Sequence, residues 1–427
     1  MKRIRPIMFF FLGLATNALL CGCNNNVDGP ESGQESTKTG PRQTKTVYLY
    51  LDNSESMAGY TKSTNMSVFV EAINAIGGYY KSQGADIGSY YLQSKTVKGV
   101  KKTDIEPVGF DALCSQISNR KLPKTDSYAI DSFFAQITQK MLSDSNKSAI
   151  AFFITDGIIS GTNEEINGST DRRFSLDNAS TLSERVADAL RPLHDKGYGA
   201  AMYRFTSGFK GDYLAYDNKR IELHNAKRPF YIIVIGESSE VAEFNKKVED
   251  GLGTFKPDES LLIDQPKPLL LLGTEVNNEV DSDLVVINYQ PHSKESKETE
   301  VEIYFQKKCL PGHLRDDSTA AEALDITFNS KPITPRTRGE IISFDISARK
   351  NEKNQTLNIK VKDILPTWVN TYNSDNDKRI SDNNQDELSK TFKLSSLVKG
   401  IMKGLYNSDG SEIITARTFK IDNTNNK

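Results

Sequence analysis

Three short runs of the chain contain only apolar or aromatic residues, and they constrain the fold more than any other feature. They are "VYLYL" (47–51), "AIAFFI" (149–154) and "FYIIVI" (230–235). A strand that is exposed on one face alternates apolar and polar residues, whereas a strand covered on both faces has no such alternation. The three runs therefore predict buried strands in a sheet that carries helices on both sides.

Amphipathic segments separate these runs, as an α/β domain requires. The spacing of apolar residues predicts helices over 66–80, 130–141, 181–193 and 241–248, with further strands at 87–93 and 199–205. Strand–helix alternation across residues 46–255 predicts a doubly wound, mostly parallel sheet. Two segments interrupt the alternation. They are a long polar loop at 160–180 and a hairpin at 213–224.

Beyond a Pro-rich boundary at 264–272 the pattern changes to period two. Five short segments, near 283–289, 299–306, 323–329, 340–347 and 356–364, alternate apolar and polar residues, and 412–421 adds a last strand. This pattern predicts a smaller antiparallel, β-sandwich-like domain over residues 265–427. An apolar stripe at 394–405 predicts one C-terminal helix, which we expect to pack on the sandwich.

The N-terminus has the pattern of an exported lipoprotein. The first 22 residues place three basic side chains before an apolar run that is too short to span a membrane, and then read "LLCGC". This ending resembles a bacterial lipobox, and we expect lipidation at Cys23, because cleavage before Cys21 would need a small residue where Leu20 stands. Residues 23–45 are polar and predict a flexible tether. A plain cleaved signal and an uncleaved anchor are the alternatives.

Composition excludes some classes of partner and site. The chain has 427 residues and a net charge of −2, and it lacks a basic cluster interleaved with aromatic residues, so we expect no nucleic-acid partner. Its 4 histidines show neither metal-ligand nor catalytic-triad spacing. Cys114 and Cys309 are left in the mature chain, and the sequence leaves open whether they pair.

Oxygen-bearing residues follow the first apolar run at alternate positions, as Asp52, Ser54 and Ser56. Ligands of doubly wound sheets bind at the carboxyl ends of the strands, where this segment is expected. The second apolar run leads to Asp156, and Thr125 precedes a predicted helix. Five hard oxygen donors suit Mg²⁺, with Mn²⁺ or Ca²⁺ as alternatives.

In order and spacing these five residues resemble the metal-ion-dependent adhesion site of von Willebrand factor type A domains. The likeness covers the α/β domain and implies that fold. It also implies that Asp52, Ser54 and Ser56 coordinate the metal, while Thr125 and Asp156 contact it directly or through water. In this family the metal accepts a carboxylate from a protein partner, which makes adhesion metal-dependent.

The same residues are also compatible with an ordinary turn or with a catalytic site. Asp-x-Ser-x-Ser alone is also an ordinary turn at the end of a strand. A hydrolase would need a nucleophile with a neighbouring base, and no histidine is placed for this role, so we expect no enzyme.

The expected function is that of a membrane-anchored lipoprotein of the bacterial cell envelope, on the periplasmic or surface face of the outer membrane, that binds a protein partner through the metal. The alternative is a scaffold component of an envelope complex with a mainly structural metal. The sequence does not predict the oligomeric state.

Overall fold

The computed structural model describes residues 45–63, 67–97, 100–122, 130–144, 149–158, 179–215, 219–273, 276–278, 284–287, 298–349, 352, 355–406 and 413–422. These residues belong to one compact unit, Thr44–Lys427. The predicted signal peptide, Cys23, residues 23–44 of the predicted tether, Thr125 and most of the polar loop lie outside them. Within the described part of the chain, no helix combines the length and the apolar character needed to cross a membrane.

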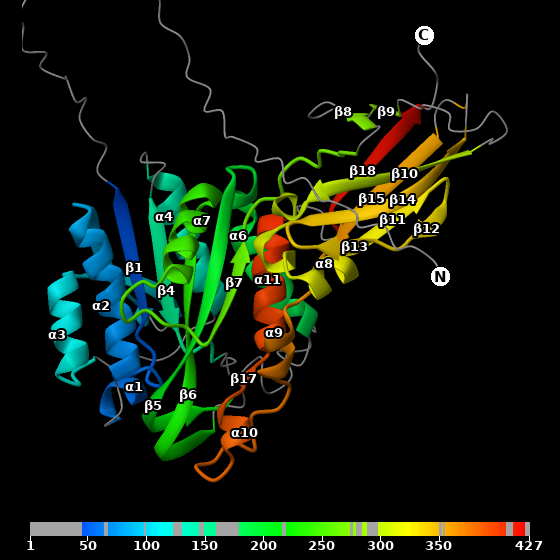
Figure 1. Cartoon of the computed structure of the whole chain (residues 1–427). Coiled ribbons are helices and arrows are strands. Elements are labelled where there is room, and N and C mark those ends of the chain that lie inside the picture. The colour runs from blue at the N-terminus through cyan, green and yellow to red at the C-terminus, as the bar shows by residue number, and fades with distance from the viewer. Residues whose placement is uncertain are drawn as a thin grey trace, which may run out of the picture. The chain divides into compact units, whose positions relative to one another are not determined.

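The larger sheet has seven strands in the order β3-β2-β1-β4-β6-β5-β7 (Figure 1). Its strands are β1 (Thr46–Asp52), β2 (Asp86–Val97), β3 (Val100–Val108), β4 (Ile150–Thr155), β5 (Tyr198–Leu214), β6 (Arg220–Glu237) and β7 (Glu259–Ile263). The two strands at its centre, β1 and β4, are buried almost throughout, as their lack of polar positions predicted.

The sheet is mixed, so the prediction of a mostly parallel sheet was wrong. Only β1 pairs in parallel, with β2 and with β4, and the other four neighbouring pairs are antiparallel. The cause is a single long hairpin. The strands predicted at 199–205 and 230–235 and the hairpin at 213–224 all belong to β5 and β6, which have 17 and 18 residues. Strand β3, which the sequence did not predict, adds the antiparallel pair at the other edge of the sheet.

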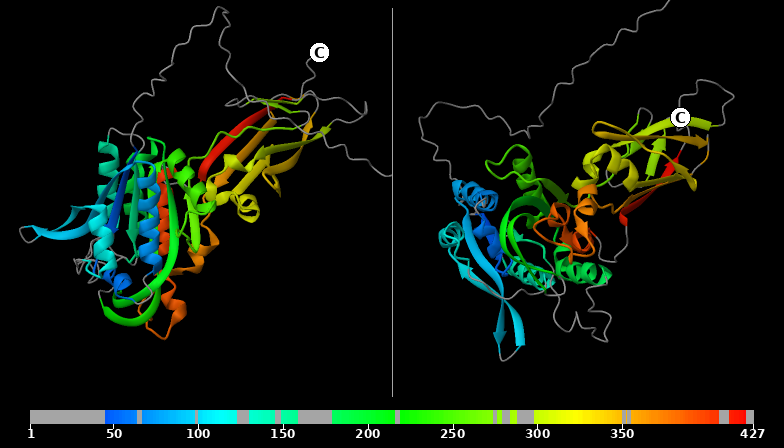
Figure 2. Two further views of the ribbon diagram at one scale, coloured as in Figure 1. Left: turned by 60° about the vertical axis from the view of Figure 1, so that its left-hand side comes forward. Right: turned by 90° about the horizontal axis from the view of Figure 1, so that it is seen from below.

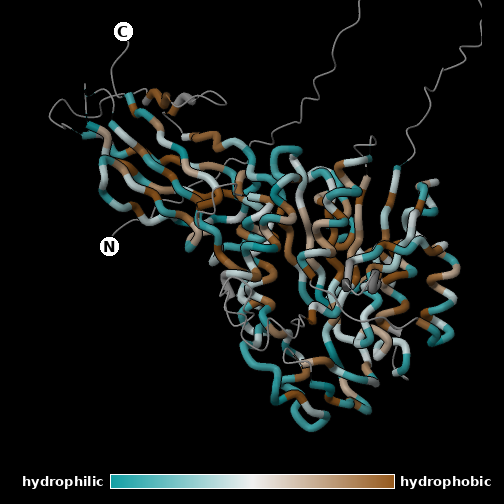
Figure 3. The backbone as a smooth tube through the Cα atoms, turned by 180° about the vertical axis from the view of Figure 1, so that it is seen from behind, coloured by the Kyte–Doolittle hydropathy of each residue, from teal (hydrophilic) through white to brown (hydrophobic). Residues whose placement is uncertain are grey.

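Helices cover both faces of this sheet (Figure 2). They are α1 (Ala58–Lys62), α2 (Ser67–Ser82), α3 (Phe110–Ser118), α4 (Ile130–Ser143), α6 (Ala179–His194) and α7 (Ser238–Glu249). Side chains of α1, α2, α3 and α7 join the apolar cluster on one face, and those of α4 and α6 join the cluster on the other. Hydrophobic residues accordingly gather along the strands and the inner sides of the helices (Figure 3). The prediction of an α/β architecture is confirmed at this level.

The C-terminal part contains two larger β-sheets, besides the two-stranded pair of β16 (Asn373–Ser374) and β17 (Thr391–Phe392). One has the order β10-β14-β13 and the other β12-β11-β15-β18-β9-β8. Their strands are β8 (Val276–Asn278), β9 (Leu284–Ile287), β10 (Glu298–Gln306), β11 (Leu324–Phe328), β12 (Lys331–Ile333), β13 (Arg336–Arg338), β14 (Ile341–Arg349), β15 (Gln355–Lys362) and β18 (Ile413–Asp422). The strands predicted from period-two segments are therefore confirmed, although β18 pairs with β9 in parallel.

The C-terminal part also contains several helices and two very short strands. They are the 3₁₀ helices η2 (Lys307–Cys309) and η3 (Gly312–Leu314), the helices α8 (Asp317–Ala323), α9 (Thr367–Thr371) and α10 (Gln385–Leu388), the two-residue strands β16 (Asn373–Ser374) and β17 (Thr391–Phe392), and helix α11 (Leu394–Tyr406). Cys114 is partly buried and Cys309 is buried, and both are free thiols.

Helix α11 lies against α6 of the α/β part, so the prediction that it packs on the sandwich was wrong. Two glycines make the close approach possible. A Cβ atom on Gly400 would lie 2.7 Å from Val186 Cβ, and one on Gly404 would lie 2.9 Å from Leu190 Cβ. The apolar stripe of α11 identified a buried helix correctly, but it carried no information about which element buries it.

This packing predicts the effect of adding one methyl group to α11. Alanine favours a helix over glycine by about 1 kcal/mol, yet Gly400→Ala should destabilise the protein by roughly 1–3 kcal/mol because the added Cβ overpacks the α6–α11 contact. The matched control is Gly78→Ala in α2, where an added Cβ would meet nothing within 4 Å, and this change should be neutral or stabilising. Urea unfolding of both variants measures the difference, and equal effects would contradict the described contact.

Candidate metal centre

The pairing of β1 with β4 brings the predicted acidic residues to one edge of the sheet. Leu51 of β1 lies opposite Ile154 of β4 in the parallel register. Asp52 ends β1, and Asp156 directly follows β4. Parallel neighbours have their carboxyl ends at the same edge, so both carboxyl groups arrive there without any long loop.

The chain turns away from the sheet directly after Asp52. The Ser54 N–H donates to Asp52 Oδ1 at 2.9 Å, which is the hydrogen bond of an Asx turn. The hydroxyl oxygens of Ser54 and Ser56 lie 3.1 Å apart, and α1 begins two residues later. The turn thus places one carboxylate and two hydroxyls together, as the alternate spacing predicted. All three side chains are buried, with exposed fractions of 6%, 6% and 2% along the chain.

Thr155 holds the first carboxylate in place, and the sequence analysis did not identify it. Its hydroxyl donates to Asp52 Oδ2 at 2.9 Å and accepts the Gly157 N–H at 3.1 Å. The available signal was its position directly before Asp156, at the end of a strand. Burial raises the pKa of Asp52 to about 7, and the charge of Asp156 adds to the rise, while the hydrogen bonds to Asp52 oppose it.

Asp156 is 1% exposed and only half satisfied. Its Oδ1 accepts the Ile158 N–H at 3.0 Å, and Oδ2 has no hydrogen-bond partner. Burial raises the pKa of Asp156, whereas the Ser56 hydroxyl and the positive charge of Arg228 lower it. Two carboxyl groups thus share a buried site in which each is hard to ionise without a compensating positive charge.

The donor set fits a hard divalent cation. It combines two carboxylates with two hydroxyls, and one buried carboxylate oxygen still lacks a partner. Thr125, the fifth predicted ligand, lies outside the described residues. Glu55 does not join the set but forms an ion pair with Arg220 at 2.6 Å. Within the described ranges no group of three or more His, Cys, Asp or Glu side chains could hold a metal, so any metal here would rely on the hydroxyls.

A segment from the C-terminal part, residues 372–392, packs beside this centre. Arg228 on β6 is fully buried, and its Nη1 donates to Leu388 O at 2.9 Å and to Lys390 O at 3.0 Å. A Tyr231 hydroxyl lies 2.8 Å from Thr391 Oγ1. The sequence analysis gave no indication of this contact, because it joins strands to a turn that is far away along the chain.

The same segment reaches the turn after Asp156. Gly157 has a φ of +68°, which favours glycine, and a Cβ there would lie 3.2 Å from the Tyr231 ring and 3.3 Å from Thr391 Cγ2. A side chain at this position would be strained and tightly packed, and the contacts that confine it come from both parts of the chain.

The raised pKa of Asp52 predicts a pH effect on stability in the absence of metal. The folded state holds this proton more tightly than the unfolded state, because the pKa rises from 3.8 to about 7. This contribution to the unfolding free energy is complete below pH 4 and is lost as the pH rises through 7. Asparagine does not titrate, so the Asp52→Asn variant lacks this pH dependence. Between pH 5 and 8 in EDTA, the unfolding free energy of the wild type should fall by roughly 2 kcal/mol more than that of Asp52→Asn, since one pKa unit corresponds to about 1.4 kcal/mol.

Urea unfolding at four pH values in this range measures the difference. Asp188→Asn is the control, since this exposed carboxylate forms a surface ion pair with Arg191. Parallel pH profiles for the wild type and Asp52→Asn would contradict the burial of an ionisable Asp52.

Comparison of the chain with protein-family models, with curated proteins and with solved structures finds no match in any of the three. The case for the centre therefore rests on the residues themselves: two neighbouring parallel strands end in buried carboxyl groups, a pair of hydroxyls lies beside them, and one carboxylate oxygen lacks a partner.

Proposed function

We propose that the edge formed by β1 and β4 binds a divalent metal ion, Mg²⁺ with Mn²⁺ or Ca²⁺ as alternatives, and that the metal binds a carboxylate of a protein partner. The observation that carries this proposal is the buried, unsatisfied Oδ2 of Asp156 beside a second buried carboxylate, that of Asp52. Burying two like charges is costly, and a divalent cation removes this cost.

The proposed fold is that of a von Willebrand factor type A domain. The parallel strands β2, β1 and β4 at the centre of the sheet and the helices on both of its faces support this assignment. The long antiparallel hairpin of β5 and β6 is a departure from a mostly parallel sheet.

Each residue of the centre has a distinct role in this proposal. A bound metal would supply a Lewis-acidic position that can accept an external carboxylate. Thr155 keeps the Asp52 carboxylate turned toward the centre, and the Asx turn places Ser54 and Ser56 beside it. The role is binding and not catalysis.

The partner would be met at the cell envelope. We propose that Cys23 carries a lipid anchor and that residues 23–45 form the tether, in a bacterial lipoprotein of the outer membrane. The sequence "LLCGC" after a short apolar run supports this part of the proposal.

A scaffold function in an envelope complex, with a mainly structural metal, is the second candidate. The observation that favours it is the contact of Thr391 with the Gly157 turn, since this contact links the centre to the C-terminal part. In that case the metal would stabilise the packing of residues 372–392 and would not meet the partner.

Metal binding is tested by calorimetry. Titration of Mg²⁺ into the wild type should give saturable binding. Asp156→Asn should weaken this binding at least ten-fold, because the substitution removes the negative charge of a central ligand. Asp188→Asn should bind as the wild type does. Equal affinity of Asp156→Asn and the wild type would place any metal elsewhere.

A pull-down from envelope extract separates the two functions. In Mg²⁺ the protein should retain a partner that EDTA releases and that Asp52→Ala fails to retain. Retention that is indifferent to EDTA would contradict metal-mediated binding and favour the scaffold.

The anchor is tested by labelling cells with palmitate. The wild type should incorporate label, and Cys23→Ala should not. Label that persists in Cys23→Ala would exclude this residue as the site of lipidation.

A further inference from the structure

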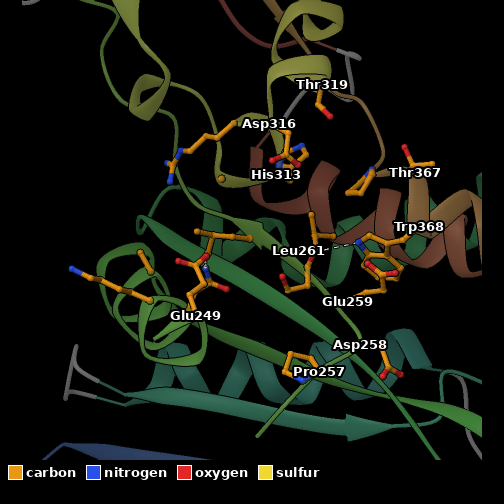
Figure 4. A pocket seen from close by; sticks show the side chains of 18 of the residues that line it. Glu249, Pro257, Asp258, Glu259, Leu261, His313, Asp316, Thr319, Thr367 and Trp368 are labelled. Carbon is orange, nitrogen blue, oxygen red and sulfur yellow. Dashed lines mark hydrogen bonds between the residues drawn. The ribbon is translucent and has the colours of Figure 1, made fainter. Parts of the chain in front are cut away.

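A groove with a volume of about 1160 Å³ lies between the edge of the larger sheet and the C-terminal part (Figure 4). Strand β7 and helix α7 form one side, and η3, α8 and α9 form the other. Leu261 lies near its middle, with His313 and Asp316 on one side and Glu249 and Trp368 on others. The groove is not lined by the proposed metal ligands that the structure describes, Asp52, Ser54, Ser56 and Asp156. Its volume exceeds the roughly 300–1,000 Å³ of small-molecule pockets, which favours an extended ligand.

The lining of the groove is acidic. Six acidic and two basic residues line it, namely Glu249, Asp250, Asp258, Glu259, Asp316, Glu340, Lys246 and Arg315. Asp258 is paired with Arg204 at 3.2 Å, and Arg315 with Asp264 at 2.7 Å. Within the described residues Asp250, Glu259, Asp316 and Glu340 form no ion pair or side-chain hydrogen bond. A groove lined by unpaired charges of one sign attracts a ligand of the opposite sign.

The carboxylates are spread out and do not converge on one point. They come from α7, β7, the turn before α8 and the turn before β14. No group of three or more acidic, His or Cys side chains in the described ranges could hold a metal ion. Dispersed carboxylates suit several separate cationic groups along one chain better than a single ion.

Aromatic and neutral groups complete the walls. The Trp368 indole N–H donates to Ser260 O at 3.2 Å, which fixes the ring at the groove. Nearby, the Arg204 guanidinium lies 3.7 Å from the Tyr372 ring centroid, so one cation already stacks on this wall. Aromatic faces beside carboxylates favour Lys and Arg, whose apolar stems and charged ends both find a partner.

His313 is buried at the inner wall of the groove. Its side chain is 1% exposed, its Nε2 lies 3.9 Å from Asp363 Oδ1, and its Nδ1 lies 3.3 Å from the Tyr406 hydroxyl. Burial lowers its pKa to about 4, and Arg315 adds to this shift while the Leu262 backbone opposes it. The ring is therefore neutral at pH 7 and does not reduce the negative charge of the groove.

We propose that this groove binds a basic peptide segment of a partner protein, with Lys or Arg side chains against Glu259, Asp316 and Glu340 and beside Trp368. Strand β7 is an edge strand, but its Ser260 carbonyl already accepts a hydrogen bond from the Trp368 indole N–H. We therefore expect the peptide to be bound through its side chains and not as an added strand of the sheet. This site is separate from the proposed metal centre. The metal would bind an acidic group of a partner, whereas the groove would bind basic groups.

Trp368 is the only tryptophan of the chain, so intrinsic fluorescence reports on this groove directly. The purified full chain is titrated in EDTA, which removes the metal centre from the measurement, with acetylated pentalysine amide at low salt. We expect saturable emission change, weakened by added salt, and no response to pentaglutamate. Calorimetry with the same peptides provides an independent reading, and Trp368→Phe should abolish only the optical signal of the protein.

The charge variants decide the location. A triple variant that combines Glu259→Gln, Asp316→Asn and Glu340→Gln should bind pentalysine on the order of ten-fold more weakly than the wild type does. The matched control removes the same charge from exposed, unpaired residues outside the groove, as Glu222→Gln, Glu243→Gln and Glu300→Gln, and should bind as the wild type does.

Three outcomes would overturn the proposal. They are no binding of pentalysine by either method, equal binding by the groove variant and its control, and binding of free spermidine as tight as that of pentalysine. The last result would assign the groove to a small polyamine. Failure of the metal centre leaves all of these measurements unchanged, because they are made in EDTA.

Discussion

The parallel pairing of β1 with β4 is the constraint on which the candidate centre depends. It sets two carboxyl groups side by side at one edge of the sheet, although they are far apart in the sequence. The pairing is held by apolar side chains on both faces of both strands, so the sheet fixes the acidic residues before any ligand is present. Two carboxylates held close together repel each other when both are ionised. A bound cation would offset this repulsion, and the centre therefore suits a cation.

Sequence patterns predicted the parts of this fold in which burial dictates the residue type. The strand at 47–51 was identifiable because both of its faces are covered. The alternate spacing of Asp52, Ser54 and Ser56 correctly predicted a turn that brings their side-chain oxygens together. The direction of the outer strands was not predictable, because β5 and β6 carry polar residues beyond the core and resemble several short elements. Local patterns do not specify such long-range pairing.

Other features depend on neighbours that the sequence does not reveal. Thr155 is a common residue at the end of a strand, and only the adjacent strand makes it the partner of Asp52. Arg228 precedes an apolar run and would be expected at the surface, yet backbone carbonyls of a remote turn allow its burial. The apolar face of α11 indicated burial, and the glycines that admit it to α6 became meaningful only in the packed structure.

The contacts of α11 and of residues 388–390 also determine when the chain can complete its fold. Domains usually fold in the order of synthesis, N-terminal part first. Here α11 packs against α6, and the hydrogen-bond acceptors of the buried Arg228 among the described residues are the carbonyls of Leu388 and Lys390. Before residues 388–406 are in place, α6 lacks the helix that packs against it and the Arg228 guanidinium lacks these two acceptors. The C-terminal end therefore acts as the closing element of the N-terminal sheet, and chains that end early would retain an unfinished core exposed to proteases.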